Sequence, residues 1–176
     1  NSNSENVQIL NNISFDIKSS DIITVFGHSG VGKTTLLSIV SGMILADSGK
    51  ITINNIDMND SNNSDLRREY MGILFQKSNL LPEFNVQDNL LLPLFINNVS
   101  YNNSVNKVNA LLKLLNLSNL LHRYPDTLSR GEYQRISLLR SIANEPAIVI
   151  ADEPTANLDE NNCKQLLDLI VKLNRE

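Results

Sequence analysis

The sequence predicts an α/β fold in which one helical segment interrupts a core of alternating strands and helices. Apolar, β-branched runs at residues 21–26 and 147–151 are typical of strands, and both flanks of the chain alternate strand and helix patterns. The stretch between the flanks has helical spacing and no convincing strand. We therefore expect a single domain over residues 1–176, with an α/β core at 1–77 and 145–176 and a helical subdomain at 78–144.

Each expected element follows from local spacing. The run at residues 147–151 is apolar throughout, which is typical of a strand buried on both faces of a parallel sheet. Ser104 is placed to cap a helix whose apolar stripe is formed by Val105, Val108, Leu112 and Leu115. Strands are expected at residues 21–26, 51–53, 71–75 and 147–151, and helices at residues 33–43, after Ser104, at 129–144 and from Glu160 onward.

Composition excludes several classes of protein. The chain has 41% hydrophobic residues and carries 15 basic against 19 acidic side chains, a net charge of −4, so it has no general attraction for nucleic acid. Cys163 is the only cysteine, which excludes an internal disulfide and a multi-cysteine zinc site, and we expect it to be a small, buried or half-buried residue. No apolar run reaches the length of a membrane helix and the first residues are no signal peptide, so we expect a soluble, intracellular protein.

A phosphate-binding pattern follows the first expected strand. Residues 27–34 match G-x-x-x-x-G-K-[ST] and open a helix, as the mechanism of such a loop requires. Backbone N–H groups would hold phosphate oxygens, Lys33 would reach the β- and γ-phosphates, and the Thr34 hydroxyl would bind Mg²⁺. The alternative is a glycine-rich turn with a chance Lys-Thr pair. The candidate nucleotide-binding residues are Gly27, His28, Ser29, Gly30, Val31, Gly32, Lys33, Thr34 and Thr35.

Two acids end the last expected strand. Asp152 and Glu153 come at its carboxyl end, where doubly wound sheets bind ligands. Asp152 would hold Mg²⁺ through a water, and Glu153 would orient or deprotonate an attacking water. The alternative is that the two acids only mark where the strand reaches solvent.

Taken together, the motifs resemble those of ABC-type ATPases. Residues 27–34 are similar to a Walker A motif, 148–153 to a Walker B motif, 128–135 to the family signature and 156–159 to the D-loop, while Gln76 matches the Q-loop glutamine. All five occur in the family's order, and the likeness spans nearly the whole chain. It implies a P-loop NTPase (RecA-like) core, with ATP and Mg²⁺ as ligands. Glu153 and Gln76 would then be catalytic, and Thr34, Gln76 and Asp152 would hold the metal. The alternative for Gln76 is an ordinary amide at a strand end.

A closer likeness concerns residues 75–94 and 152–159. These segments are similar to the lipoprotein-releasing ATPases (LolD type), in a group that also contains macrolide-exporter ATPase domains and the cell-division ATPase FtsE. The resemblance implies the ATP-hydrolysing subunit of a transporter, lying at the cytoplasmic face of the inner membrane and bound to integral membrane subunits. In residues 80–96 most apolar side chains are expected in the helical core, and Leu81, Phe84 and Val86 are candidates for contact with a membrane subunit.

The resemblance also implies a head-to-tail dimer of ATPase subunits. Each ATP would lie between one Walker A motif and the partner's signature residues Ser129, Arg130, Gly131 and Glu132, and Asp159 of the D-loop would lie at the interface. Two structural alternatives stay open. Ser129-x-x-Glu132 is a capping box pattern, and Asp159 is placed to cap the helix that begins at Glu160.

The chain departs from the family pattern in three places. Arg130 stands where the family has glycine. We expect it to point away from the phosphates with an ordinary helix-start backbone; the alternative is that it adds a cation near the phosphates. No aromatic residue precedes Phe15 to stack on adenine, and the family's switch histidine would fall beyond Glu176, since His28 and His122 are in the wrong places. We therefore expect a segment truncated before its final strands.

The motifs also occur in proteins with two other functions. A DNA-associated ABC ATPase would need a long heptad insertion or zinc-binding cysteines between the Walker A motif and the signature; the sequence has neither, so we expect no nucleic-acid partner. A nucleotide-dependent scaffold of a cell-division or envelope complex, similar to FtsE, stays open as the alternative to a transporter motor.

Overall fold

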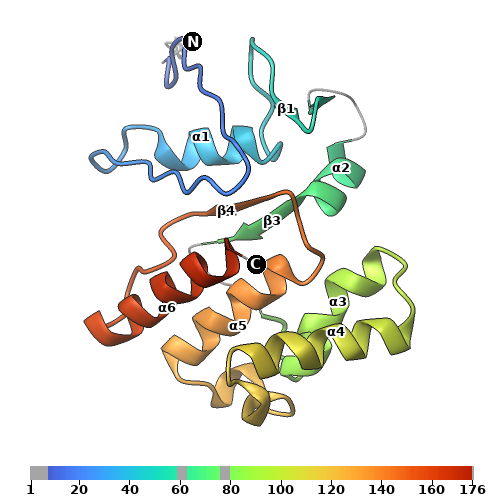
Figure 1. The fold of residues 1–176 in the computed structure, drawn as a ribbon. Coiled ribbons are helices and arrows are strands. Elements are labelled where there is room, and N and C mark those ends of the chain that lie inside the picture. The colour runs from blue at the N-terminus through green and yellow to red at the C-terminus, as the bar shows by residue number, and fades with distance from the viewer. Residues whose placement is uncertain (1–7, 59–62, 76–79, 176) are drawn as a thin grey trace, which may run out of the picture.

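The computed structural model describes residues 8–58, 63–75 and 80–175 (Figure 1). Its helices are α1 (Lys33–Val40), α2 (Asn63–Tyr70), α3 (Val86–Ile96), α4 (Tyr101–Leu114), α5 (Arg130–Ile142) and α6 (Glu160–Leu173), with short 3₁₀ turns η1 (Ser118–Leu120) and η2 (Pro125–Thr127). Its strands are β1 (Thr52–Ile53), β2 (Ile56–Asp57), β3 (Met71–Leu74) and β4 (Ile148–Ala151).

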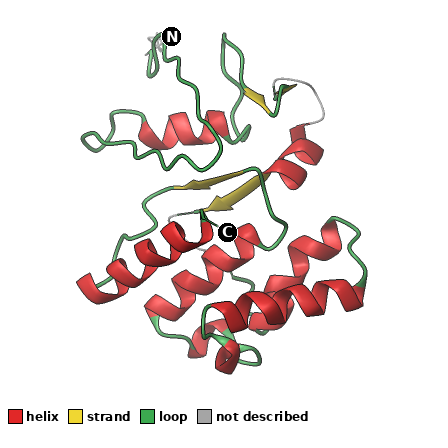
Figure 2. Cartoon of the chain, viewed as in Figure 1, coloured by secondary structure: helices red, strands yellow, loops and turns green. Residues whose placement is uncertain are grey.

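The strands β3 and β4 form a parallel pair at the centre of the core. Their register runs from Met71 opposite Ile148 to Leu74 opposite Ala151. A parallel pair needs a long crossover connection, and in Figure 2 the described part of that connection consists of helices and loops. The separate pair β1–β2 is antiparallel.

Helices cover both faces of the β3–β4 pair, which makes a three-layer arrangement (Figure 1). On one face Leu37 and Val40 of α1 pack against the buried Met71 and Ile150. On the other face the buried Leu74 packs with side chains of α5 and α6, namely Leu138, Leu166 and Leu169. Alternate residues of each strand therefore serve different layers, as the two-residue period of a strand requires.

A second hydrophobic core lies among α3, α4 and α5. Its fully buried members come from all three helices and include Leu90, Leu94, Val108, Leu112, Ile136 and Leu139. The helical stripe expected around Val108 and Leu112 is thus present and faces this core. α5 belongs to both cores, because Leu138 packs toward β3 while its neighbour Leu139 packs toward α3 and α4.

The strand expected at residues 21–26 is wrong. This segment has no regular structure, and its apolar side chains are exposed, Phe26 by 87%. Strand propensity is expressed only where a neighbouring strand accepts the backbone hydrogen bonds. Among the residues the structure describes, β4 pairs only with β3, so the segment has no partner for a ladder.

Two further expectations need correction. β4 is not fully buried on both faces, because Val149 is 41% exposed. Ser104 does not cap α4, since the helix begins one turn earlier with Ser100 in the extended backbone of an N-cap. Ser104 is instead fully buried, and its hydroxyl donates to the Val99 carbonyl at 3.4 Å.

The helix expected at residues 33–43 forms as α1 but ends at Val40. Gly42 follows with a φ of 66°, the left-handed conformation that commonly terminates a helix. Over the described residues, no helix combines the length and the apolar character needed to cross a membrane.

Candidate nucleotide-binding site

The glycine-rich loop leads directly into α1, with Gly32 as the N-cap residue. Gly32 has a φ of 102°, and a Cβ there would come within 2.9 Å of the Ile9 methyl group. Gly30 has a φ of 80° with open space beside it. Side chains strongly disfavour both backbone conformations, so the shape of this loop requires glycine at these two positions.

The start of α1 offers backbone donors to an anion. Within the described structure no side chain caps this end, and its first turn, which includes Lys33, Thr34 and Thr35, holds no acid. The first N–H groups of a helix have no intrahelical partner and carry partial positive charge. Lys33 reaches back over the loop, where its Nζ donates to the carbonyls of Gly27 at 2.8 Å and His28 at 2.9 Å. An ammonium group and free N–H groups therefore converge at the loop, which fits a phosphate chain.

Thr34 and Asp152 meet beside this loop. Thr34 Oγ1 donates to Asp152 Oδ2 at 3.0 Å, and Asp152 is held in place because its own N–H donates to the Leu74 carbonyl, also at 3.0 Å, in continuation of the β3–β4 pairing. A hydroxyl and a carboxylate are hard oxygen ligands, and Mg²⁺ is typically held by one or two such groups together with phosphates and water. The pair therefore fits Mg²⁺ on a bound nucleotide.

Glu153 follows Asp152 in an unusual backbone conformation. Its φ is 47°, in the left-handed region, and the side chain is exposed. Its carbonyl accepts from Ala156 N at 3.0 Å, and the next carbonyl, of Pro154, accepts from Gln134 Nε2 at 2.8 Å. Such conformations persist when surrounding contacts impose them, and they are frequent at active sites. Gln76, the other expected catalytic residue, lies outside the described residues.

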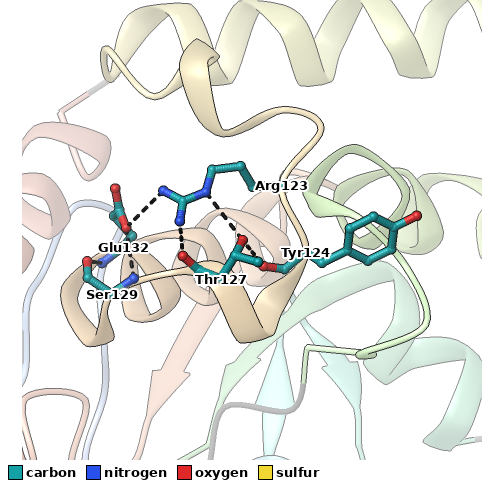
Figure 3. Close-up of polar contacts among 5 residues, drawn as sticks. All are labelled: Arg123, Tyr124, Thr127, Ser129 and Glu132. Carbon is teal, nitrogen blue, oxygen red and sulfur yellow. Dashed lines mark hydrogen bonds and ion pairs between the residues drawn. The ribbon is translucent and has the colours of Figure 1, made fainter.

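The signature begins with a complete capping box, as its spacing predicts (Figure 3). Ser129 Oγ accepts from Glu132 N at 3.3 Å, and Ser129 N donates to Glu132 Oε2 at 2.8 Å. The hydrogen bond from the Ser129 N–H holds the pKa of Glu132 below its usual value, with a further contribution from Arg123.

Arg123 stabilises the turn that precedes the signature. The sequence did not predict this role. Arg123 Nη1 lies 3.7 Å from Glu132 Oε2, an ion pair. The same guanidinium makes two hydrogen bonds to Thr127: Nε donates to the hydroxyl at 3.3 Å, and Nη2 donates to the carbonyl (Figure 3). The Thr127 hydroxyl donates in turn to the Tyr124 carbonyl at 2.7 Å. The one available signal was an arginine four residues before a threonine across a proline-containing turn.

Arg130 is the first residue of α5 and is exposed, with an ordinary helical backbone. The expectation that it begins the helix without strain is confirmed. Gly131, by contrast, is buried within the subunit against Asn162 of α6.

Asp159 is the N-cap residue of α6, so the capping role is confirmed. Its carboxylate accepts from Asn162 N at 2.9 Å and from Asn162 Nδ2 at 2.5 Å, and these bonds lower the pKa of Asp159. The interface role of Asp159 stays a prediction. Cys163, which follows Asn162 in α6, is half-buried as expected.

Asn89 organises the loop that enters α3, and sequence reasoning missed it. The side chain is fully buried. Its Oδ1 accepts from Leu81 N at 2.8 Å, and its Nδ2 donates to the carbonyls of Leu81, Phe84 and Asn85 at 2.9–3.0 Å. Leu81 and Phe84 are exposed on this loop, so they remain contact candidates. Val86 is wrong as a candidate, because it is fully buried in the helical core as the first residue of α3.

A three-layer α/β core whose glycine-rich loop opens a helix beside the end of a parallel strand defines a P-loop NTPase. A family model described as ABC transporter matches residues 10–156. The chain belongs to this family of ATP-binding subunits, which are ATPases coupled to transport.

Individual relatives agree with this assignment. The chain is 39% identical over 173 residues to the lipoprotein-releasing system ATP-binding protein LolD of Buchnera aphidicola subsp. Schizaphis graminum, covering 97% of this chain and 76% of the relative. LolD of Cytophaga hutchinsonii is 38% identical over 96% of this chain and 78% of its own length. The methionine import ATP-binding protein MetN of Clostridium tetani is 39% identical over 96% of this chain and 54% of its own length. The expected likeness to LolD-type ATP-binding subunits is confirmed.

Solved structures confirm the fold class. The ATP-binding cassette MJ0796, described as a dimer in a post-hydrolysis state bound to ADP and Pi, has a TM-score of 0.81 and 31% sequence identity, over 94% of this chain and 75% of that one. A second dimeric structure of the same bacterial cassette also has a TM-score of 0.81.

Proposed function

We propose that this chain hydrolyses MgATP to power a membrane complex that releases or exports lipoproteins or related cargo. The observation that carries the proposal is the hydrogen bond from Thr34 to Asp152. It places oxygen ligands from two motifs beside the loop that Lys33 spans, where a nucleotide-bound Mg²⁺ would lie.

This arrangement supports roles for several residues of the subunit. The loop at residues 27–32 and the start of α1 hold the phosphates, Thr34 and Asp152 hold Mg²⁺, and Gln76 joins them as its match to the Q-loop implies. Glu153 orients or deprotonates the attacking water, and Gln76 senses the γ-phosphate. Residues 1–77 and 145–176 form the ATP-binding core and residues 78–144 the helical subdomain, in one domain.

A second ATPase subunit completes each site. Ser129 and the start of α5 face the partner's γ-phosphate, since a helix start with a hydroxyl donor suits an anion. Asp159 lies at the same interface. Membrane subunits bind the exposed loop that carries Leu81 and Phe84, which holds the complex at the cytoplasmic face of the inner membrane.

Lipoprotein release is supported by the LolD proteins of several bacteria, which are 34–39% identical over 96–99% of this chain. MetN is 39% identical over 96% of this chain. A shared ATPase module explains the MetN match, because fold and catalytic site alone do not select cargo.

Depletion of the protein in its own cell tests the cargo, with lipoproteins followed in separated inner- and outer-membrane fractions. We expect lipoproteins to accumulate in the inner membrane, with rescue by the wild-type gene and no rescue by Lys33→Ala. Normal lipoprotein sorting after depletion would contradict lipoprotein release. Rescue by Glu153→Gln would favour the scaffold role over the motor.

A further inference from the structure

Gly131 has no room for a side chain within its own subunit. It lies in the first turn of α5, and the space beside its Cα is filled by Asn162 of α6. A Cβ on Gly131 would overlap the Asn162 amide oxygen and lie 2.5 Å from Asn162 Cγ. Contacts this close do not occur in proteins, so any larger residue would displace Asn162.

Asn162 is in turn fixed by Asp159. One carboxylate oxygen of Asp159 accepts from the Asn162 backbone N–H at 2.9 Å, and the other accepts from Asn162 Nδ2 at 2.5 Å. The amide nitrogen is therefore bound to the cap of α6 while the amide oxygen lies against Gly131. Pushing Asn162 away from Gly131 would strain its charge-assisted bond to Asp159.

Two more contacts join the same two helices and their entry loops. Gln134 of α5 donates to the Pro154 carbonyl at 2.8 Å, and Arg135 donates to Gln165 of α6. The start of α5 and the segment that leads into α6 therefore form one connected unit.

We propose that Asn162 is a positioning residue that holds the signature turn and the D-loop turn at a fixed spacing, and that position 131 is glycine because of this contact. The inference rests on the proposed function, in which both turns face the partner's nucleotide. One subunit then presents Ser129 and Asp159 to its partner as a single rigid surface. A disturbance at Gly131 reaches Asp159 through Asn162.

Paired substitutions in the native full-length protein test the contact. Alanine is a better helix former than glycine, so Gly131→Ala alone would stabilise α5 if nothing stood beside it. We expect Gly131→Ala instead to lower the midpoint of denaturant unfolding. In an Asn162→Ala background the same change should be neutral or stabilising. Asn161 is an exposed neighbour in the same turn and supplies the matched control. In an Asn161→Ala background, Gly131→Ala should still lower the unfolding midpoint.

ATP-dependent dimerisation tests the positioning role, because packing alone would not change it. Asn162→Asp keeps the side-chain volume but removes the Nδ2 donor and sets a second carboxylate beside Asp159. We expect it to weaken MgATP-dependent dimerisation by about tenfold or more, whereas Asn161→Asp changes it by less than about twofold.

Three results would overturn the inference. The first is a Gly131→Ala protein whose midpoint of denaturant unfolding is unchanged, and the second is a midpoint that Gly131→Ala lowers equally with and without Asn162→Ala. The third is an Asn162→Asp protein that dimerises with MgATP as strongly as the wild type. If the wild-type protein itself never dimerises with MgATP, the proposed function fails, and the unfolding midpoints still decide whether Asn162 excludes a side chain at position 131.

Discussion

Thr34 Oγ1 and Asp152 Oδ2 lie 3.0 Å apart although 118 residues separate them in the chain. Two elements create this contact: α1 packs on the face of β3–β4 that carries Ile150, and β4 ends at Ala151, directly before Asp152. The packing of these two elements therefore holds a hydroxyl and a carboxylate within hydrogen-bond distance of each other, where both could bind one cation.

Loss of the Thr34 hydroxyl should impair the use of Mg²⁺. Thr34→Val keeps the shape but removes the oxygen, so we expect the Mg²⁺ concentration for half-maximal ATP hydrolysis to rise by about tenfold or more. Thr34→Ser retains the hydroxyl and serves as the control. An unchanged Mg²⁺ titration for Thr34→Val would show that this hydroxyl does not hold the metal.

Asn89 should contribute far more to stability than the nearby Asn85. Asn89→Ala leaves the Leu81 N–H and the Phe84 carbonyl without the partner that the Asn89 amide supplies, whereas the carbonyls of Leu81 and Asn85 keep backbone donors. Each buried group left unsatisfied costs about 1–3 kcal/mol, so we expect a loss of about 2 kcal/mol or more in the free energy of unfolding. Asn85→Ala removes only a helix cap, the bond from Asp88 N, and should cost about 1 kcal/mol. Equal losses in denaturant titrations would contradict this account.

The capping box at the signature should make stability depend on pH. The pKa of Glu132 in the folded protein lies below its ordinary value of 4.5. The ionised carboxylate therefore contributes its full stabilisation at pH values above 4.5, and this stabilisation is lost as the pH falls through the lowered folded-state pKa. Glu132→Gln keeps an acceptor for Ser129 N but loses the charge. We expect wild type to be more stable than Glu132→Gln by about 0.5 kcal/mol at neutral pH, with the difference vanishing in acid. A difference that persists in acid would rule out the charge as its source.

Arg130 should not contribute to ATP turnover. It is exposed and begins α5 with an ordinary backbone, so it neither strains the turn nor fills the place of a phosphate ligand within its own subunit. We expect Arg130→Gly to preserve or raise turnover in the assembled transporter, with a small loss of stability because glycine weakens a helix start. A large drop in turnover at unchanged stability would show that the Arg130 cation acts directly on the nucleotide.

Local features of the fold could be predicted from sequence because their causes are local. The capping box of Ser129 and Glu132 and the cap at Asp159 need only residues three apart, and both are present. The shape of the glycine-rich loop has a similarly local cause, because Gly30 and Gly32 both have a positive φ that side chains disfavour.

Features that depend on distant partners could not be predicted in the same way. Residues 21–26 have the composition of a strand, yet a strand forms only beside another strand. Val86 lies in a segment that resembles a loop, so its sequence position suggests contact with a membrane subunit. In the structure α3 begins at Val86, and the helix points this side chain into the helical core. Asn89 and Asn162 are ordinary asparagines among many in this sequence, and only the structure reveals what each one touches.

The central claim is that two copies of this chain close over ATP held by the Lys33 loop and the pair Thr34–Asp152. The most direct measurement is the molecular mass in solution of the native full-length protein carrying Glu153→Gln, which should bind ATP without turning it over. We predict that MgATP doubles the mass and that MgADP restores the monomer. A variant that binds ATP tightly and stays monomeric would contradict the account.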